Sequence, residues 1–376
     1  MKLRRITTHG NWIPEIDSLR FVAIATTLLT HILGKVYLES GKTFALSKYD
    51  FDAVMYRGGR GVPLFFAISG FILAQPFLRQ RLLHGKAVSV KAFFLRRLTR
   101  LEPPYILSLL IYTAVLAIHH HHSLAWPLLA HIFYLNNFFH LTKINFVTWS
   151  LEVEVQFYLL APVFGYLYAL SSTVVRRSLI VALILASAYL QFVSQGVASQ
   201  NLPGQLQFFL IGFLLADLRA TRTDATTSCW WDLVSPIAWI TIFALPVRYI
   251  SFSFPALILL AYLAIFNGPV TRQIFRTQWV ALTGGMCYSF YLMHMLVINA
   301  GFKLTQCFVF SSSLSLSFLI QTILLGASIG VFCTAYFVLI ERPCMDPNWP
   351  RKLIARLSNW SPPKESILIE TSVEDR

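Results

Sequence analysis

The stretch DSLRFVAIATTLLTHILGKVY, residues 17–37, decides how this chain folds. It is long enough to cross a bilayer, which takes about 17–25 apolar residues as a helix. Arg20 and His31 lie eleven residues apart within it, so both point to the same side along about 16 Å of helix. Charged groups near a helix centre in a membrane cost about 2.5–3.5 kcal/mol each and therefore face protein or a water-filled cavity. We predict buried chemistry on this face.

The composition predicts an integral membrane protein. Of 376 residues, 56% are apolar and 13% are charged, against about 25% charged in soluble proteins. Apolar runs recur along almost the whole sequence and leave no room for a separate soluble domain. We therefore expect one all-α membrane domain over residues 1–345, and a cytoplasmic, disordered tail over residues 346–376, which is polar and ends in an acidic stretch.

Segment lengths predict about ten transmembrane helices around a central cavity. The expected spans are 17–37, 61–78, 101–118, 148–170, 178–195, 204–218, 230–247, 250–267, 279–301 and 314–340. We expect the shorter apolar segment 126–140 to be re-entrant or interfacial, because a crossing there would reverse the positions of Arg176 and Arg177.

Basic residues predict that both termini are cytoplasmic. With that orientation the inside segments hold 22 Lys and Arg, and the outside segments hold 8. Short cytoplasmic loops are enriched in these residues, so the net charge of +14 reports topology and we expect no nucleic-acid partner. The first apolar stretch lacks a small-residue cleavage site, which favours a retained helix over a removed signal peptide.

Cysteine and histidine patterns give no sign of redox or metal chemistry. The five cysteines form no C-x-x-C pair, and we interpret them as packing residues. His119–His122 are adjacent and lack the helical spacing of a tight metal site, so no metal is expected.

His31 has the chemistry of a general base, since an imidazole can take a proton from an attacking hydroxyl. The alternative is a structural histidine that a neighbouring helix satisfies. Arg20 stays charged and suits a phosphate or a carboxylate. His294 lies three residues after Tyr291, on the same helical face. The two side chains can line a cavity, or they can form hydrogen bonds across helices.

Two further motifs have both a functional and a structural interpretation. Glu152 and Glu154 open a spanning segment, where one of them can orient His31 or simply offset the helix dipole. Arg96, Arg97 and Arg100 form one cationic patch if they are helical. That patch suits a phosphorylated cytosolic donor, and it equally suits positive-inside anchoring.

Taken together, six motifs in order resemble the acyltransferase-3 family over residues 14 to 343. They are Asp17-Ser18-Leu19-Arg20 with His31; Gly61 to Phe71; Arg96-Arg97 with Arg100, Pro103 and Tyr105; Trp149-Ser150-Leu151 with Glu154, Phe157 and Tyr158; Tyr288-Ser289 with Tyr291, Leu292 and His294; and Glu341-Arg342-Pro343. Three positions depart from the family pattern. Pro63 stands where an aspartate is common, Glu152 where a serine is common, and Val155 where a second acid is common, which leaves Glu154 as the better candidate acid.

The resemblance implies an O-acyltransferase that moves an acyl group, often acetyl from acetyl-CoA, to a hydroxyl of a saccharide or glycosylated lipid. It implies catalytic roles for His31 and Glu154, and CoA binding by Arg96, Arg97 and Arg100. The remaining motif residues are expected to bind substrate: Arg20, Tyr105, Trp149, Ser150, Tyr291 and His294. We expect the chain in an inner, or plasma, membrane. The rival class is a transporter or exporter of a saccharide or related metabolite, because inward-facing His, Arg and Glu also mark transport paths.

Overall fold

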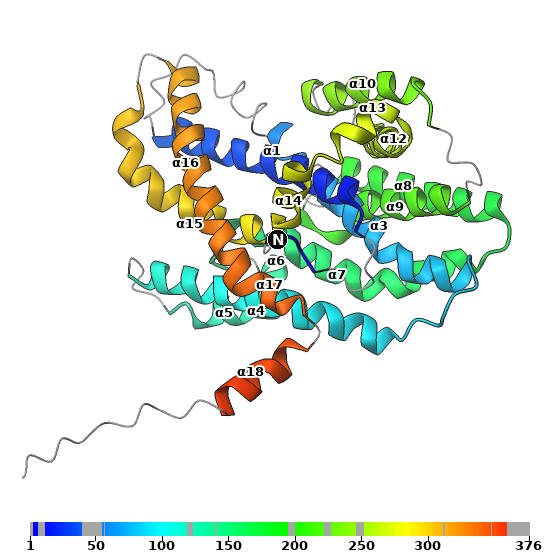
Figure 1. The fold of residues 1–376 in the computed structure, drawn as a ribbon, viewed down its shortest axis with the longest axis horizontal. Helices are drawn as coiled ribbons and strands as arrows, with labels where there is room; N and C mark the ends of the chain where they lie inside the picture. The colour runs from blue at the N-terminus through cyan, green and yellow to red at the C-terminus, as the bar shows by residue number, and fades with distance from the viewer. Residues whose placement is uncertain are drawn as a thin grey trace, which may run out of the picture.

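The computed structural model describes residues 3–6, 12–39, 55, 57–118, 123–139, 141–194, 200–221, 227–245, 252–310, 313–346 and 348–358. This part of the chain is helical and contains no strand, as predicted (Figure 1). The long helices are α1 (Pro14–Glu39), α3 (Gly61–Arg81), α4 (Val90–Ala117), α7 (Trp149–Phe164), α8 (Thr173–Val193), α9 (Leu202–Ala220), α10 (Trp230–Ala244), α12 (Phe254–Asn267), α15 (Cys287–Thr305) and α16 (Leu314–Tyr336). The short ones are α5 (Ala125–Ile132), α6 (Asn136–Phe139), η1 (Phe146–Thr148), η2 (Gly165–Ala169), α13 (Pro269–Ile274), α14 (Gln278–Gly285), η4 (Gln306–Phe308), η5 (Phe337–Glu341), α17 (Arg342–Cys344) and α18 (Trp349–Ser358).

Each of the ten predicted spans contains helix, but fewer are long and apolar enough to cross a membrane alone. By length and composition, the described residues hold four such helices: α1, α3, α8 and the continuous helix Leu314–Cys344. A fifth span results if α14 and the helix Cys287–Phe308, which are bent by 70°, count as one. α10 and α12 have 15 and 14 residues, or about 22 Å and less against a hydrocarbon core of about 30 Å. The total of ten crossings stays a prediction.

Three boundaries differ from the predicted ones. The segment 126–140 forms two helices of eight and four residues, each too short to cross, while their place relative to the bilayer stays a prediction. α4 begins at Val90 instead of residue 101, because Ser89 caps it by accepting from the Ala92 N–H at 3.3 Å. α18 lies in the segment expected to be a disordered tail; residues 359–376 are outside the described part.

One proline in α4, Pro103, explains where α18 contacts this helix. Pro103 has no N–H, so within the helix the carbonyl of Thr99 loses its usual partner four residues on. The indole Nε1 of Trp349, at the start of α18, donates to that carbonyl at 2.8 Å. The beginning of α18 is therefore attached to α4 beside Arg100.

α1 connects two apolar clusters. Its first half contributes Leu19 and Ala23 to a cluster built mainly from α3, α7, α8, α9 and α12. Its second half contributes Ile32 and Val36 to a cluster with α4, α15 and α16. In Figure 1, α1 (blue) accordingly runs between α15 and α16 on one side and α3 and α9 on the other. The polar face of α1 can thus contact side chains from the helices of both apolar clusters.

One buried carboxylate outside the site is paired with two arginines. Asp217 of α9 is 0% exposed and accepts from Arg176 Nε at 2.5 Å and from Arg177 Nε at 2.6 Å. Both arginines lie in the first turns of α8, so the pair joins the start of α8 to the end of α9. All five cysteines are free; Cys333 and Cys344 are buried as expected, whereas Cys229 and Cys307 are exposed.

The close packing of α3 on α9 predicts a strong effect of one methyl group. A Cβ at Gly212 would lie 2.2 Å from the Phe71 N and 2.3 Å from the Ala67 O, which are backbone atoms that cannot rotate away. We expect Gly212→Ala to destabilise the purified protein by about 1–3 kcal/mol through overpacking. Thermal unfolding in detergent measures the change.

Gly326→Ala is the matched control, because a Cβ at Gly326, also inside a helix, meets nothing within 4 Å. Its melting temperature should stay the same or rise, since alanine favours helix over glycine. Equal melting temperatures for the two variants would contradict the packing of α3 on α9.

Candidate active site

A cavity of about 960 Å³ is lined by residues of α1, α3, α4, α7 and α15. Arg20 and His31 both line it, which confirms the prediction from helical spacing that they share a face. The basic residues of its lining are Arg5, Arg20, Arg79, Lys86, Arg96, Arg97 and Arg100. Its acidic residues are Asp17, Glu154 and Glu341. The cavity therefore carries an excess of positive charge.

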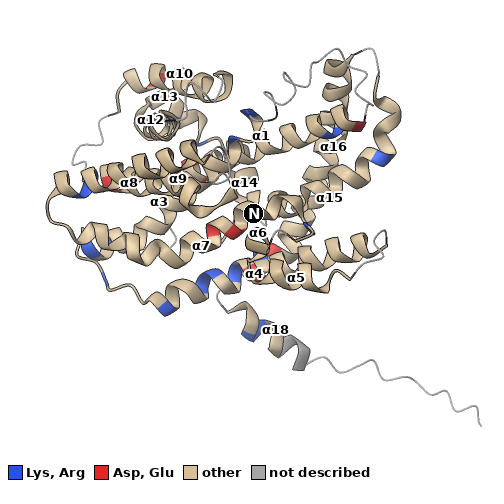
Figure 2. Cartoon of the chain, turned by 180° about the vertical axis from the view of Figure 1, so that it is seen from behind, with Lys and Arg blue, Asp and Glu red and all other residues tan. Residues whose placement is uncertain are grey.

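The three arginines predicted to bind the cofactor are helical and line the cavity together. Arg96, Arg97 and Arg100 all lie on α4, which Figure 2 shows as a helix with several basic segments. Arg97 donates to the Phe93 carbonyl at 3.0 Å, and its guanidinium lies 3.7 Å from the centre of the Phe93 ring. Within the described residues, none of the three forms an ion pair with a carboxylate within 4.0 Å. Their charges are thus available to an anionic ligand.

Arg20 also lines the cavity, but it has a carboxylate partner. Asp17 accepts from Arg20 Nη1 at 2.6 Å and from Arg5 Nη1 at 2.9 Å. Its second oxygen accepts from the Trp12 indole at 2.8 Å. Two cations share one buried anion, so this group keeps a net positive charge.

His31 forms its hydrogen bond with His294, across α1 and α15. The distance from His31 Nδ1 to His294 Nε2 is 2.8 Å, and the two ring planes are within 2° of parallel. His294 is 0% exposed and does not line the cavity, whereas His31 is partly exposed and does. Of the two interpretations of His294 in the sequence, the hydrogen bond across helices is confirmed, and direct substrate binding by this residue has no support in the geometry.

Glu154 lines the cavity, but the predicted orienting contact with His31 is wrong. Its Oε1 accepts from the Ser69 hydroxyl of α3 and from the Tyr158 hydroxyl, the latter at 2.7 Å. The Tyr158 ring in turn lies 5.6 Å from the Arg97 guanidinium. Glu154 thus contacts α3 through Ser69. Through Tyr158 it is also connected to Arg97 of α4. Glu152 is 0% exposed and accepts from the Asn137 N–H at 2.8 Å, which is a structural role.

The other predicted substrate residues divide into two groups. Trp149, Ser150 and Tyr291 line the cavity. Ser150 Oγ lies 3.1 Å from the Tyr291 hydroxyl, which donates to the Val147 carbonyl at 2.5 Å. Tyr105 is 0% exposed and outside the lining, and its hydroxyl donates to the His131 carbonyl at 2.9 Å, so the structure gives it a packing role.

Sequence reasoning gave no role to Ser69 and Glu341, although both lie in quoted motifs. Glu341, in the π-helical turn η5, accepts from the Ser289 N–H at 3.0 Å and from the Ser289 hydroxyl at 2.6 Å. The carboxylate thereby caps the start of α15, which follows the bend after α14. A pairing between residues 52 positions apart leaves no local signal in the sequence.

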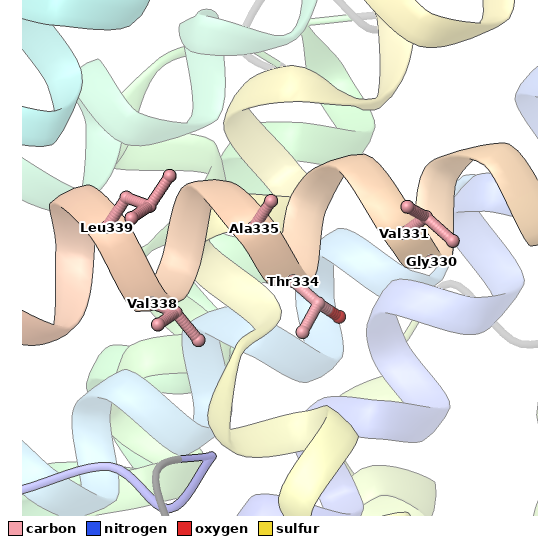
Figure 3. A pocket seen from close by; sticks show the side chains of 6 residues that line it. All are labelled: Gly330, Val331, Thr334, Ala335, Val338 and Leu339. Atoms are coloured by element: carbon pink, nitrogen blue, oxygen red, sulfur yellow. The ribbon is translucent and has the colours of Figure 1, made fainter.

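The described part of the chain holds no group of three or more His, Cys, Asp or Glu that could bind a metal ion, and His119–His122 lie outside that part. A second hollow is lined by six residues of one continuous helix, shown in Figure 3: Gly330, Val331, Thr334, Ala335, Val338 and Leu339. None of these side chains titrates, and an apolar face on a spanning helix suits contact with lipid.

Comparison with known proteins decides the family. The model of the acyltransferase-3 family, described as an acyltransferase domain, matches residues 13–341. The chain belongs to this family. Its first-helix histidine, its arginine motif on α4 and its closing Glu341 thus occur in a chain that matches the acyltransferase-3 model over nearly its full length.

Curated relatives of this acyltransferase-3 chain match part of it. A Staphylococcus aureus (strain COL) protein named as a putative O-acetyltransferase is 30% identical over 166 residues, 40% of this chain and 24% of its own. A Caenorhabditis elegans protein named regulator of hypoxia-inducible factor 1 is 28% identical over 183 residues, 42% of this chain and 35% of its own. A protein of Acidianus two-tailed virus named as a putative acetyltransferase is 26% identical over 162 residues, 43% of each chain.

The chain thus spans about a quarter to two fifths of the length of these relatives. No solved structure matches it significantly. Family membership and the names of the relatives support an O-acyltransferase in a membrane.

The cap on α15 generates a prediction about stability. Ser289 is 0% exposed, and Ser289→Ala leaves the buried Glu341 carboxylate with one donor fewer. We expect a loss of about 1–3 kcal/mol in the free energy of unfolding, the usual cost of an unsatisfied buried group. Chemical denaturation in detergent measures it.

Ser328→Ala is the control, because the Ser328 side chain is exposed and its hydroxyl donates only to the Leu324 carbonyl of its own helix. Its effect should stay within about 0.5 kcal/mol. A Ser289→Ala protein as stable as Ser328→Ala would show that the bond from the Ser289 hydroxyl to Glu341 does not stabilise the fold.

Proposed function

We propose that this protein is a membrane O-acyltransferase that moves an acyl group, acetyl in the simplest case, from acyl-CoA to a hydroxyl of a saccharide or glycosylated lipid. The observation that carries the proposal is that one cavity is lined both by three arginines without carboxylate partners among the described residues and by a histidine whose Nε2 forms no hydrogen bond there. The arginines suit a phosphorylated donor, and the histidine suits proton removal from an alcohol.

The basic end of the cavity fits the phosphates of CoA. Arg96, Arg97 and Arg100 offer guanidinium groups, which bind phosphate through paired N–H donors. From the level of Arg20 to that of His31 the cavity follows α1 for about 16 Å. CoA carries its thioester at the end of a long flexible arm, so phosphates bound near α4 leave the acyl carbon free to reach His31. We propose that the donor end opens to the cytosol, where acyl-CoA is made, and that both termini lie on that side.

At the other end, His31 takes the proton of the attacking hydroxyl. The hydroxyl oxygen bonds to the acyl carbon, the carbon–sulfur bond breaks, and the proton passes by way of His31 to the sulfur, which leaves as the CoA thiol. In the alternative two-step route, His31 carries the acyl group from the sulfur of CoA to the hydroxyl oxygen. Glu154 acts on the donor side, where Tyr158 connects it to Arg97.

The acceptor side of the cavity supports a saccharide. Phe146 and Trp149 both line the cavity, and the Phe146 ring centre lies 6.4 Å from that of His31. Flat apolar rings beside hydroxyl-bearing groups such as Ser150 and Tyr291 suit a sugar, which has apolar faces and a polar rim. We further propose that the acceptor is attached to lipid or is a small glycoside, and that the protein lies in an inner, or plasma, membrane.

A transporter or exporter is the second candidate, because a charged cavity in a helical bundle is also what a transport path requires. The two functions differ in what a deletion strain loses. Loss of an acyltransferase removes acetate from a surface saccharide that is still exported, whereas loss of an exporter removes the saccharide.

The role of His31 is tested in a deletion strain complemented with the wild-type chain or with His31→Ala. We expect the acetate per sugar unit, measured by mass spectrometry of surface glycans, to fall by about 10²- to 10⁴-fold, the usual contribution of a general base. The amount of saccharide should stay constant. Near-normal acetylation by a folded His31→Ala protein would refute the role of His31, and loss of the saccharide itself would favour the exporter.

Kinetics with acetyl-CoA test the role of the arginines of α4 in donor binding. In membranes supplied with labelled acetyl-CoA, Arg97→Gln and Arg100→Gln should each raise KM for acetyl-CoA about 10- to 100-fold, because a hydrogen bond to a charged group contributes about 1.5–3 kcal/mol. Arg351→Gln is the control, since Arg351 is exposed on α18 and outside the cavity. If all three variants keep the wild-type KM, acyl-CoA does not bind at α4.

A further inference from the structure

We propose that His294 is a positioning residue that fixes the tautomer of His31 and leaves His31 Nε2 as the proton acceptor for the attacking hydroxyl. The inference rests on the proposed function and assigns His294 a role other than the substrate binding expected from the sequence.

His294 is the buried member of the pair, and its hydrogen bonds fix the position of its proton. His294 Nδ1 lies 2.8 Å from the Phe290 carbonyl oxygen and 2.9 Å from the Tyr291 carbonyl oxygen. Carbonyl oxygens accept hydrogen bonds and cannot donate them, so the proton of His294 is on Nδ1. In the neutral ring, Nε2 then carries a lone pair and can only accept.

The bond to His294 also fixes the proton of His31. Its Nδ1 lies 2.8 Å from His294 Nε2, and two ring nitrogens at this distance need one proton between them. Because His294 Nε2 is the acceptor, the proton is on His31 Nδ1. The lone pair of neutral His31 is therefore on Nε2. In the part of the chain that the structure describes, no hydrogen bond occupies this nitrogen, and His31 lines the cavity.

His294 is well suited to this role because its helix is held in place around it. Asn145 donates to the Leu292 carbonyl at 3.1 Å, and Tyr291 donates to the Val147 carbonyl at 2.5 Å, which attaches this turn of α15 to η1. A functional histidine keeps one tautomer when its second nitrogen has a fixed partner. Here that partner is a neutral imidazole instead of a carboxylate.

The contact also persists through the reaction. When the acceptor hydroxyl attacks the acyl carbon, its proton goes to His31 Nε2, and the ring becomes an imidazolium that still donates from Nδ1 to His294. The positive charge strengthens this bond. The proton then leaves Nε2 for the sulfur of CoA, and both histidines return to their starting tautomers.

Kinetics of two variants test the proposal. His294→Phe keeps the ring volume and removes the acceptor; His294→Gln keeps an amide oxygen that can accept from His31 Nδ1. In membranes with labelled acetyl-CoA as the varied substrate, we expect His294→Phe to lower kcat roughly 10- to 100-fold, as loss of the partners that orient metal-binding histidines does. KM for acetyl-CoA should change less than threefold, because the arginines remain, and His294→Gln should retain more of the wild-type kcat than His294→Phe. An unchanged kcat in folded His294→Phe overturns the proposal, as does an equal loss in both variants.

Nitrogen NMR of the wild-type protein tests the tautomer without activity and without a folded His294 variant. The chain is labelled with ¹⁵N-histidine, and the signals of His31 are those absent from His31→Ala. We expect the shift of a protonated nitrogen at Nδ1 and of a lone-pair nitrogen at Nε2; the reverse assignment overturns the proposal. The role of His31 as a base and the role of His294 as its positioning residue can be refuted separately. An active His31→Ala protein refutes the base itself, whereas an inactive His31→Ala with a fully active His294→Phe refutes only the role of His294.

Discussion

Ionised side chains in a lipid-spanning bundle need partners within the protein, and this requirement organises the whole molecule. Asp217 binds two arginines, and Asp17 lies between Arg5 and Arg20. Three cations without a carboxylate within 4.0 Å among the described residues, Arg96, Arg97 and Arg100, line a cavity. Such a cavity can hold an anionic ligand, and the polar groups to which we assign the chemistry line the same cavity.

α1 makes this arrangement possible because it belongs to both apolar clusters. Its polar face passes from the basic end of the cavity to His31, so one helix sets the spacing between the two places for which we propose donor binding and proton transfer. α15 supports the second half of α1 through His294, and Glu341 fixes the start of α15. The two halves of the bundle therefore meet at the residues for which we propose the chemistry.

Helical periodicity predicted the parts of the site that lie on one element. It placed Arg20 with His31 and put Arg97 beside Arg100, and the motif order predicted the family. It could not predict contacts between elements distant in sequence. The bond from His31 to His294 joins positions 263 residues apart, and the partner of Glu154 on α3 depends on how the helices pack. Tyr105 shows the same limit, since a motif position cannot tell a cavity side chain from one that donates to a buried carbonyl.

A cryo-electron microscopy structure of the full chain with a non-reactive thioether analogue of acetyl-CoA tests the central claim most directly. The account predicts the CoA phosphates on Arg97 and Arg100 and the acyl carbonyl beside His31 Nε2, in the cavity along α1. An analogue bound outside this cavity, or a His31 ring turned into lipid, would contradict it.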